Sequence, residues 1–118
     1  MADWDDSYQV TTKHHATINT GTGTVDSFAD TEGRAVEWHY TVDKGSGANM
    51  RTGVIRSVFD TVPDSSPVMM PDKYSDSIGT VSIIFSVDKS GNSVRLRGTV
   101  TSDGWRVDVT RLLIGAES

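Results

Sequence analysis

Apolar and polar residues alternate along most of the chain, as they do in half-buried β-strands. The clearest example is residues 35–42, where one set of positions holds Val36, Trp38, Tyr40 and Val42. A period of two places such a set on one face of a strand. The pattern also predicts strands over residues 10–18, 50–60, 78–87, 94–100 and 105–113. No segment has the period of an amphipathic helix, so the pattern predicts an all-β fold.

Two similar segments, residues 43–49 and 88–93, separate strands that lie next to each other in the sequence. Both are built from Asp, Lys, Gly, Ser and Asn. Glycine tolerates positive φ, and Asn and Asp bond their own backbone, so both segments predict β-hairpins. The likeness is confined to the turns and their flanks, which favours shared turn chemistry over duplication.

About seven strands separated by short turns predict an antiparallel two-sheet sandwich or jelly roll without significant helix; a closed barrel is the alternative. We expect Val25 and Phe28 to anchor the core, although no strand is predicted around them. The rest of the predicted core consists of alternating positions in the strands: Val36, Trp38, Tyr40, Val81, Ile83, Phe85, Leu96, Val107 and Val109.

Residues 61–77 break the alternation and hold all three prolines, Pro63, Pro67 and Pro71. Proline cannot donate to a strand ladder, so we predict a long connection without a central strand. Val68, Met69 and Met70 make this segment too apolar for a linker. We expect it to contact a neighbouring subunit; the alternative is that it caps one open end of the sandwich.

Residues 1–9 form an acidic arm, followed by a single sandwich domain over residues 10–118. Trp4 stands among Asp3, Asp5 and Asp6. A large apolar ring among carboxylates cannot form a core alone, so we expect Trp4 to dock in a pocket of this or another subunit; the alternative is that it is disordered. The arm lacks the basic and then apolar pattern of a signal peptide, and we expect synthesis in a cytoplasm.

Composition and charge argue against several classes of function. The net charge of −5 disfavours binding to nucleic acid and to anionic membrane surfaces. The absence of cysteine excludes thiol nucleophiles, disulfides and thiolate metal sites. His14 and His15 are adjacent on a predicted strand and point to opposite faces, so they cannot share a metal ion. Residues 88–92 lack the acidic ladder of a calcium loop. We therefore expect no enzyme activity, cofactor or metal.

Four arginines, Arg95, Arg97, Arg106 and Arg111, lie in the last third of the chain. If strand 94–100 pairs with strand 105–113, the first three share an outward face. That face is either a solvated surface balanced by neighbouring carboxylates or a cationic patch that meets an acidic neighbour, such as the arm of another copy.

The order of small motifs resembles β-sandwich modules in virion structural proteins of tailed bacteriophages, including fibre, tail and head-associated proteins. The likeness spans residues 16–114. It rests on residues 24–28, 34–38 and 51–58 in one half and on residues 79–85, 90–92, 94–96 and 107–111 in the other. The resemblance implies a non-enzymatic, oligomeric component of a symmetric particle, without catalytic residues. The proline-rich segment departs from the pattern.

We therefore expect a tail-associated virion protein (fibre, baseplate or neck) that binds copies of itself and other virion proteins. A head decoration protein and a carbohydrate-binding module are the alternatives; in the latter, Trp4, Tyr40 and Tyr74 would meet a glycan. The candidate interface residues are Trp4, Tyr8, Val68, Met69, Met70, Tyr74, Arg95 and Arg97.

Overall fold

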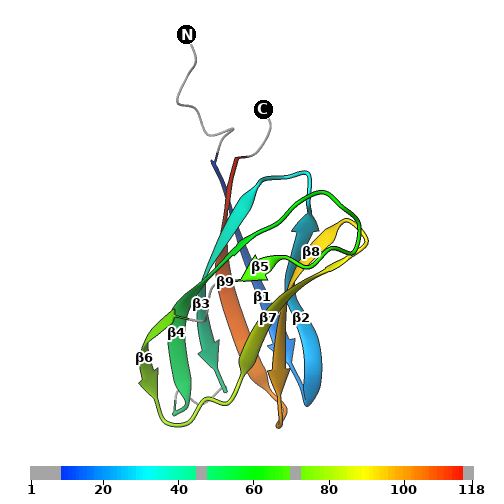
Figure 1. Cartoon of the computed structure of the whole chain (residues 1–118). Helices are drawn as coiled ribbons and strands as arrows, with labels where there is room; N and C mark the ends of the chain where they lie inside the picture. The colour runs from blue at the N-terminus through cyan, green and yellow to red at the C-terminus, as the bar shows by residue number, and fades with distance from the viewer. Residues whose placement is uncertain (1–8, 45–47, 70–72, 116–118) are drawn as a thin grey trace.

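A computed structural model describes residues 9–44, 48–69 and 73–115. These residues form two antiparallel sheets packed as a sandwich, without a helix, which confirms the predicted fold class (Figure 1). The nine strands are β1 (Gln9–Ile18), β2 (Gly21–Ala29), β3 (Ala35–Asp43), β4 (Met50–Val58), β5 (Val68–Met69), β6 (Lys73–Ile78), β7 (Ile84–Ser90), β8 (Ser93–Val100) and β9 (Trp105–Ile114). The described part of the chain has no helix that could span a membrane.

The larger sheet has the order β1-β9-β3-β4, with β5 and β6 at opposite ends of the free edge of β4. The smaller sheet has the order β2-β8-β7. The chain changes sheets after β1, after β2, after β6 and after β8 (Figure 1). Both predicted hairpins are present, as β3–β4 and β7–β8.

The core lies between the two sheets and contains the predicted residues. Trp38, Leu96 and Val107 are fully buried, and Val81 is half-buried against the core. Val25 and Phe28 are also buried, because the register of β2 shifts between Thr24 and Asp26. This bulge explains why no simple alternation marked β2 in the sequence.

The prediction that residues 61–77 hold no central strand is confirmed for their described part, which includes β5 and most of β6; both lie at the edge of the larger sheet, where nearby prolines are tolerated. The single strand predicted over residues 78–87 is wrong, because residues 79–83 cross between the sheets and residues 84–87 belong to β7. Gly79, at a φ of 69°, turns the chain away from the larger sheet. Ile83 and Phe85 still point into the core, so the alternation continues across the break.

A polar cluster is enclosed between the sheets. Arg111 of β9 donates from Nη1 to both carboxylate oxygens of Asp26 at 3.1 Å, and the indole of Trp38 donates to Asp26 Oδ2 at 2.9 Å. The guanidinium also lies 5.0 Å from the ring centre of Phe28. The side chains of Arg111 and Asp26 are 10% and 6% exposed, so this buried pair fixes how the two sheets meet.

Candidate interaction surface

Four apolar residues lie in register across the outer face of the larger sheet. Ile114 of β9 is opposite Ala35 of β3, which is opposite Val58 of β4, which is opposite Val68 of β5. Directly opposed residues point to the same face of a sheet, so the four side chains form one line across four strands. We call this line the apolar row.

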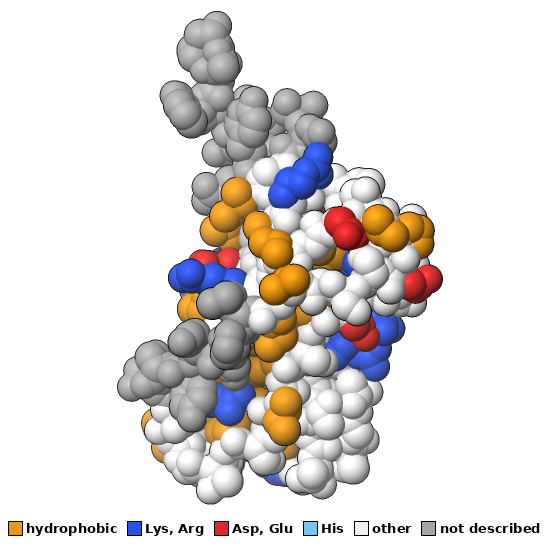
Figure 2. Space-filling view, in the orientation of Figure 1, with side chains coloured by type: hydrophobic (Ala, Val, Ile, Leu, Met, Phe, Trp, Pro, Cys, Tyr) orange, Lys and Arg blue, Asp and Glu red, His pale blue; other side chains and the backbone are white. Residues whose placement is uncertain are grey.

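The apolar row is open to solvent. Ile114, Val58 and Val68 are 50%, 54% and 67% exposed, and Ala35 is half-buried. Together with Glu37, Arg56 and neighbouring backbone, the row lines a groove of about 360 Å³. Exposed hydrophobic side chains also form a broken band on the face drawn in Figure 2. Contiguous exposed apolar side chains rimmed by polar residues are typical of interaction sites.

Charged residues border the apolar row on the same face. Glu37 of β3 lies opposite Arg56 of β4, and its Oε2 is 2.9 Å from Arg56 Nε. Its other oxygen, Oε1, is 2.6 Å from Nε2 of His39. The side chain of Arg56 is 66% exposed. A guanidinium has five N–H donors, so a largely exposed Arg56 paired with Glu37 through Nε can also meet a ligand of opposite charge.

Lys89 holds the loop that leads into β5 and so positions Val68. Its side chain is fully buried, and Nζ donates to the carbonyl oxygens of Asp60 at 2.8 Å and Val62 at 2.6 Å. Asp30 Oδ2 lies 2.8 Å from Nζ as an ion pair without hydrogen-bond alignment. The ammonium group thus joins the loop to β7 and to the end of β2.

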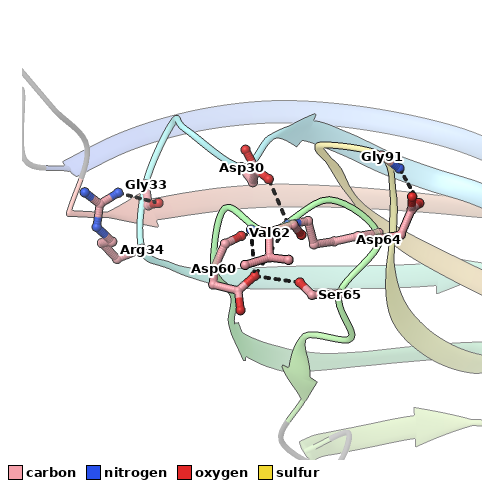
Figure 3. Close-up of polar contacts among 9 residues, drawn as sticks. Asp30, Gly33, Arg34, Asp60, Val62, Asp64, Ser65 and Gly91 are labelled. Carbon is pink, nitrogen blue, oxygen red and sulfur yellow. Dashed lines mark hydrogen bonds and ion pairs between the residues drawn. The ribbon is translucent and has the colours of Figure 1, made fainter.

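The same loop is also fixed through Asp60 and Asp64 (Figure 3). Asp60 accepts hydrogen bonds from the Ser65 hydroxyl at 2.6 Å and the Val62 amide at 3.0 Å. These bonds, with a smaller contribution from Lys89, lower the pKa of Asp60. Asp64, at a φ of 58°, exchanges hydrogen bonds with the β7–β8 turn at Gly91. The segment before β5 is therefore a fixed part of the fold.

The predicted interface residues lie in different parts of the structure, and some fall outside the described residues. Val68 lies in the apolar row, whereas Met69 is half-buried against the core, as in the alternative in which the segment caps the sandwich. Tyr74 lies on β6, and its side chain is outside the described part of the chain. Trp4, Tyr8 and Met70 fall outside the described residues.

Arg95 and Arg97 lie on the outer face of the smaller sheet, away from the apolar row. Arg95 donates to both oxygens of Asp88 at 2.7 Å, which raises the pKa of Arg95. The outward face that they would share with Arg106 if β8 paired with β9 does not form, because β8 and β9 belong to different sheets. Arg106 instead meets Asp108 on the larger sheet.

Sequence reasoning missed Ile114, Ala35 and Val58. Each follows or precedes a buried strand residue and shows no local signal of its own. Their alignment depends on the pairing of β3 with β9, which are about 70 positions apart in the chain. Only the adjacent apolar pairs Val58-Phe59 and Leu113-Ile114 indicated more apolar side chains than one buried face can hold.

A second groove, of about 440 Å³, lies further along the same outer face. It is polar, and its lining includes Lys13, His15, His39, Thr52, Asp108 and Thr110. Among the described residues, no group of three or more His, Asp or Glu is placed to hold a metal ion.

Comparison of the sequence with models of known families and with curated proteins finds no match.

Proposed function

We propose that the chain is a structural protein of the virion of a tailed bacteriophage, made in the host cytoplasm and associated with the tail. Its role is to bind copies of itself and other virion proteins, without enzyme activity or a cofactor. The observation that carries this proposal is the apolar row, which leaves Ile114, Val58 and Val68 half-exposed or more on the outer face of the larger sheet.

Burial of the row by another subunit is favourable. Removing apolar surface from water gains about 25 cal/mol per Å². The side chains already stand in fixed strand positions, so their burial requires little further ordering. The resemblance of the chain to virion sandwich modules supports the same role and connects it to a symmetric particle.

Quantitative mass spectrometry of purified virions from the source culture tests the proposal. We expect the chain in every preparation, at a fixed ratio to the major tail protein. Its absence from virions, while it is abundant in infected cells, would contradict a structural role. Its fractionation with heads after tails are removed would place it among head decoration proteins.

A carbohydrate-binding module is the second candidate, and the polar groove at His15 and Asp108 is the observation that favours it. Tyr40, which the sequence suggested as a platform for a sugar ring, is only 2% exposed and belongs to the core. That part of the expectation is wrong. Binding of a defined sugar in a glycan array, lost in His15→Ala, would favour this function.

A further inference from the structure

We propose that the acidic N-terminal arm of a second copy of this chain occupies the apolar row, with Trp4 in its groove. The inference rests on the proposed function, because it supplies the contact through which copies assemble. The occupant of the groove is the segment of residues 1–8 of a neighbouring subunit.

The position of β1 brings the arm to this surface. Gln9, where β1 begins, is paired with Ile114, the first member of the apolar row. The arm therefore leaves each subunit at the end of the row. If two subunits meet through the ends of their sandwiches at which β1 begins, each arm starts beside the groove of the other subunit.

The chemistry of the arm matches that of the surface. Trp4 supplies the large apolar ring that a groove lined by Ala35, Val58 and Val68 lacks. Asp3, Asp5 and Asp6 flank the ring. Arg56 borders the groove with a side chain that is 66% exposed; it is paired through Nε with Glu37, so the arm's carboxylates would share this guanidinium with Glu37. A buried tryptophan surrounded by charge-assisted contacts is typical of the residues that dominate binding energy.

The length of the arm favours a neighbour over the same subunit. Three spacings of about 4.8 Å separate β1 from β4, so Val58 lies about 14 Å from the line of β1. The five residues from Trp4 to Gln9 span at most about 17 Å when fully extended. An arm folded back onto its own row must turn through a right angle, and its backbone then reaches Ile114 and Ala35, one and two spacings from β1, but not Val68, four spacings or about 19 Å away. The far end of the groove, at Val68, is therefore left to the arm of a neighbour.

Two variants of the full chain test the inference. Trp4→Ala removes the arm's ring, and Val58→Asp places a like charge in the groove that meets the arm. Ile84→Asp is the matched control, because Ile84 is 69% exposed on β7 of the other sheet. Sedimentation velocity measures assembly, and the unfolding midpoint of each variant shows that it is folded.

We expect Trp4→Ala and Val58→Asp each to weaken assembly about 30-fold, and Ile84→Asp to leave it unchanged. A mixture of the two weakened variants should assemble better than either alone, because the intact arm of one meets the intact groove of the other. Acrylamide quenching should also show Trp4 shielded in the wild-type assembly.

Two results would overturn the inference while leaving the proposed function standing. In the first, Trp4→Ala assembles like the wild type while Val58→Asp does not. In the second, both variants fail to assemble and their mixture does not recover, which places each arm on its own subunit. A wild-type chain that does not self-associate, although present in virions, would overturn the inference and reduce the proposed function to the binding of other virion proteins. A chain absent from virions and monomeric would overturn both.

Discussion

At the scale of single residues, the most consequential contact is the buried pair of Arg111 and Asp26. Replacing Arg111 by Met should lower the free energy of unfolding by about 3–5 kcal/mol, because the Asp26 carboxylate stays buried with only the Trp38 indole to meet it. Urea denaturation gives the value.

Arg106→Met is the matched control for that change. Arg106 also lies on β9 and also meets an aspartate, but its side chain is 59% exposed. Exposed ion pairs contribute about 0–1 kcal/mol, so we expect a small effect. Equal losses in the two variants would show that the buried cluster does not stabilise the sandwich.

Asp60 makes stability depend on pH. Its pKa is lowered first by the hydrogen bonds from Ser65 and Val62 and then by Lys89. A carboxyl whose pKa is lower in the folded than in the unfolded chain stabilises the fold above its ordinary pKa. That contribution is lost as the pH falls through the folded value. Between about pH 5 and pH 2, the melting temperature of the wild type should therefore fall more steeply than that of Asp60→Asn. If the two proteins lose melting temperature equally as the pH falls, Asp60 does not contribute to the pH dependence of stability.

At the scale of elements, Lys89 fixes the loop before β5. Lys89→Met removes the donor to the carbonyls of Asp60 and Val62 and leaves Asp30 buried without its cation. We expect a loss of about 3–5 kcal/mol. Hydrogen exchange should also speed up at the Asp64 amide, which bonds Gly91. An unchanged exchange rate there would mean that other contacts hold the loop.

Gly79 controls the crossing between sheets. Its φ of 69° is unfavourable for other residues, and a Cβ placed there would collide with the backbone oxygen of Ala48. Gly79→Ala should cost about 2 kcal/mol or more. Gly91→Ala, at a φ of 59° with open space around it, should cost about 1 kcal/mol. Thermal unfolding of the two variants makes the comparison. A Gly79→Ala protein as stable as Gly91→Ala would show that the crossing adapts to a side chain.

The elements also show which structural features a sequence can predict. The β3–β4 and β7–β8 hairpins were predicted because their signals are local: alternation on each side of a turn. The break at Gly79 was missed because the chain keeps packing onto one core while it changes sheets. The possible pairing of β8 with β9 does not occur, because β9 joins the other sheet. A turn after Val100 has the same sequence signals whether the next strand joins the same sheet or the opposite one.

The candidate surface was predicted only in part for the same physical reason. Val68 stood out because an apolar residue among prolines has no core to join. Ile114 and Val58 became part of the surface only through the pairing of β9, β3 and β4. Alignment across strands that are distant in sequence is a property of the assembled sheet, and alternation along one strand cannot supply it.

At the scale of the whole molecule, the buried polar clusters and the exposed apolar row lie in different parts of the sandwich. The Arg111 and Lys89 clusters are enclosed and hold the sheets and the proline-rich loop in place. The apolar row lies on the outer face, where those fixed elements present it to solvent. The arrangement joins a rigid sandwich to a surface suited to another subunit, as the proposed structural role requires.

The most direct test of whether the apolar row is an assembly surface is the mass of the protein in solution. Sedimentation equilibrium measures this mass from micromolar to millimolar concentration. We expect a defined oligomer for the wild type and for Ile84→Asp, whereas Val58→Asp should assemble only at about 30-fold higher concentration, with an unchanged melting temperature. Val58→Asp that assembles as well as the wild type, or a wild type that stays monomeric throughout the range, would contradict the assembly role of the apolar row.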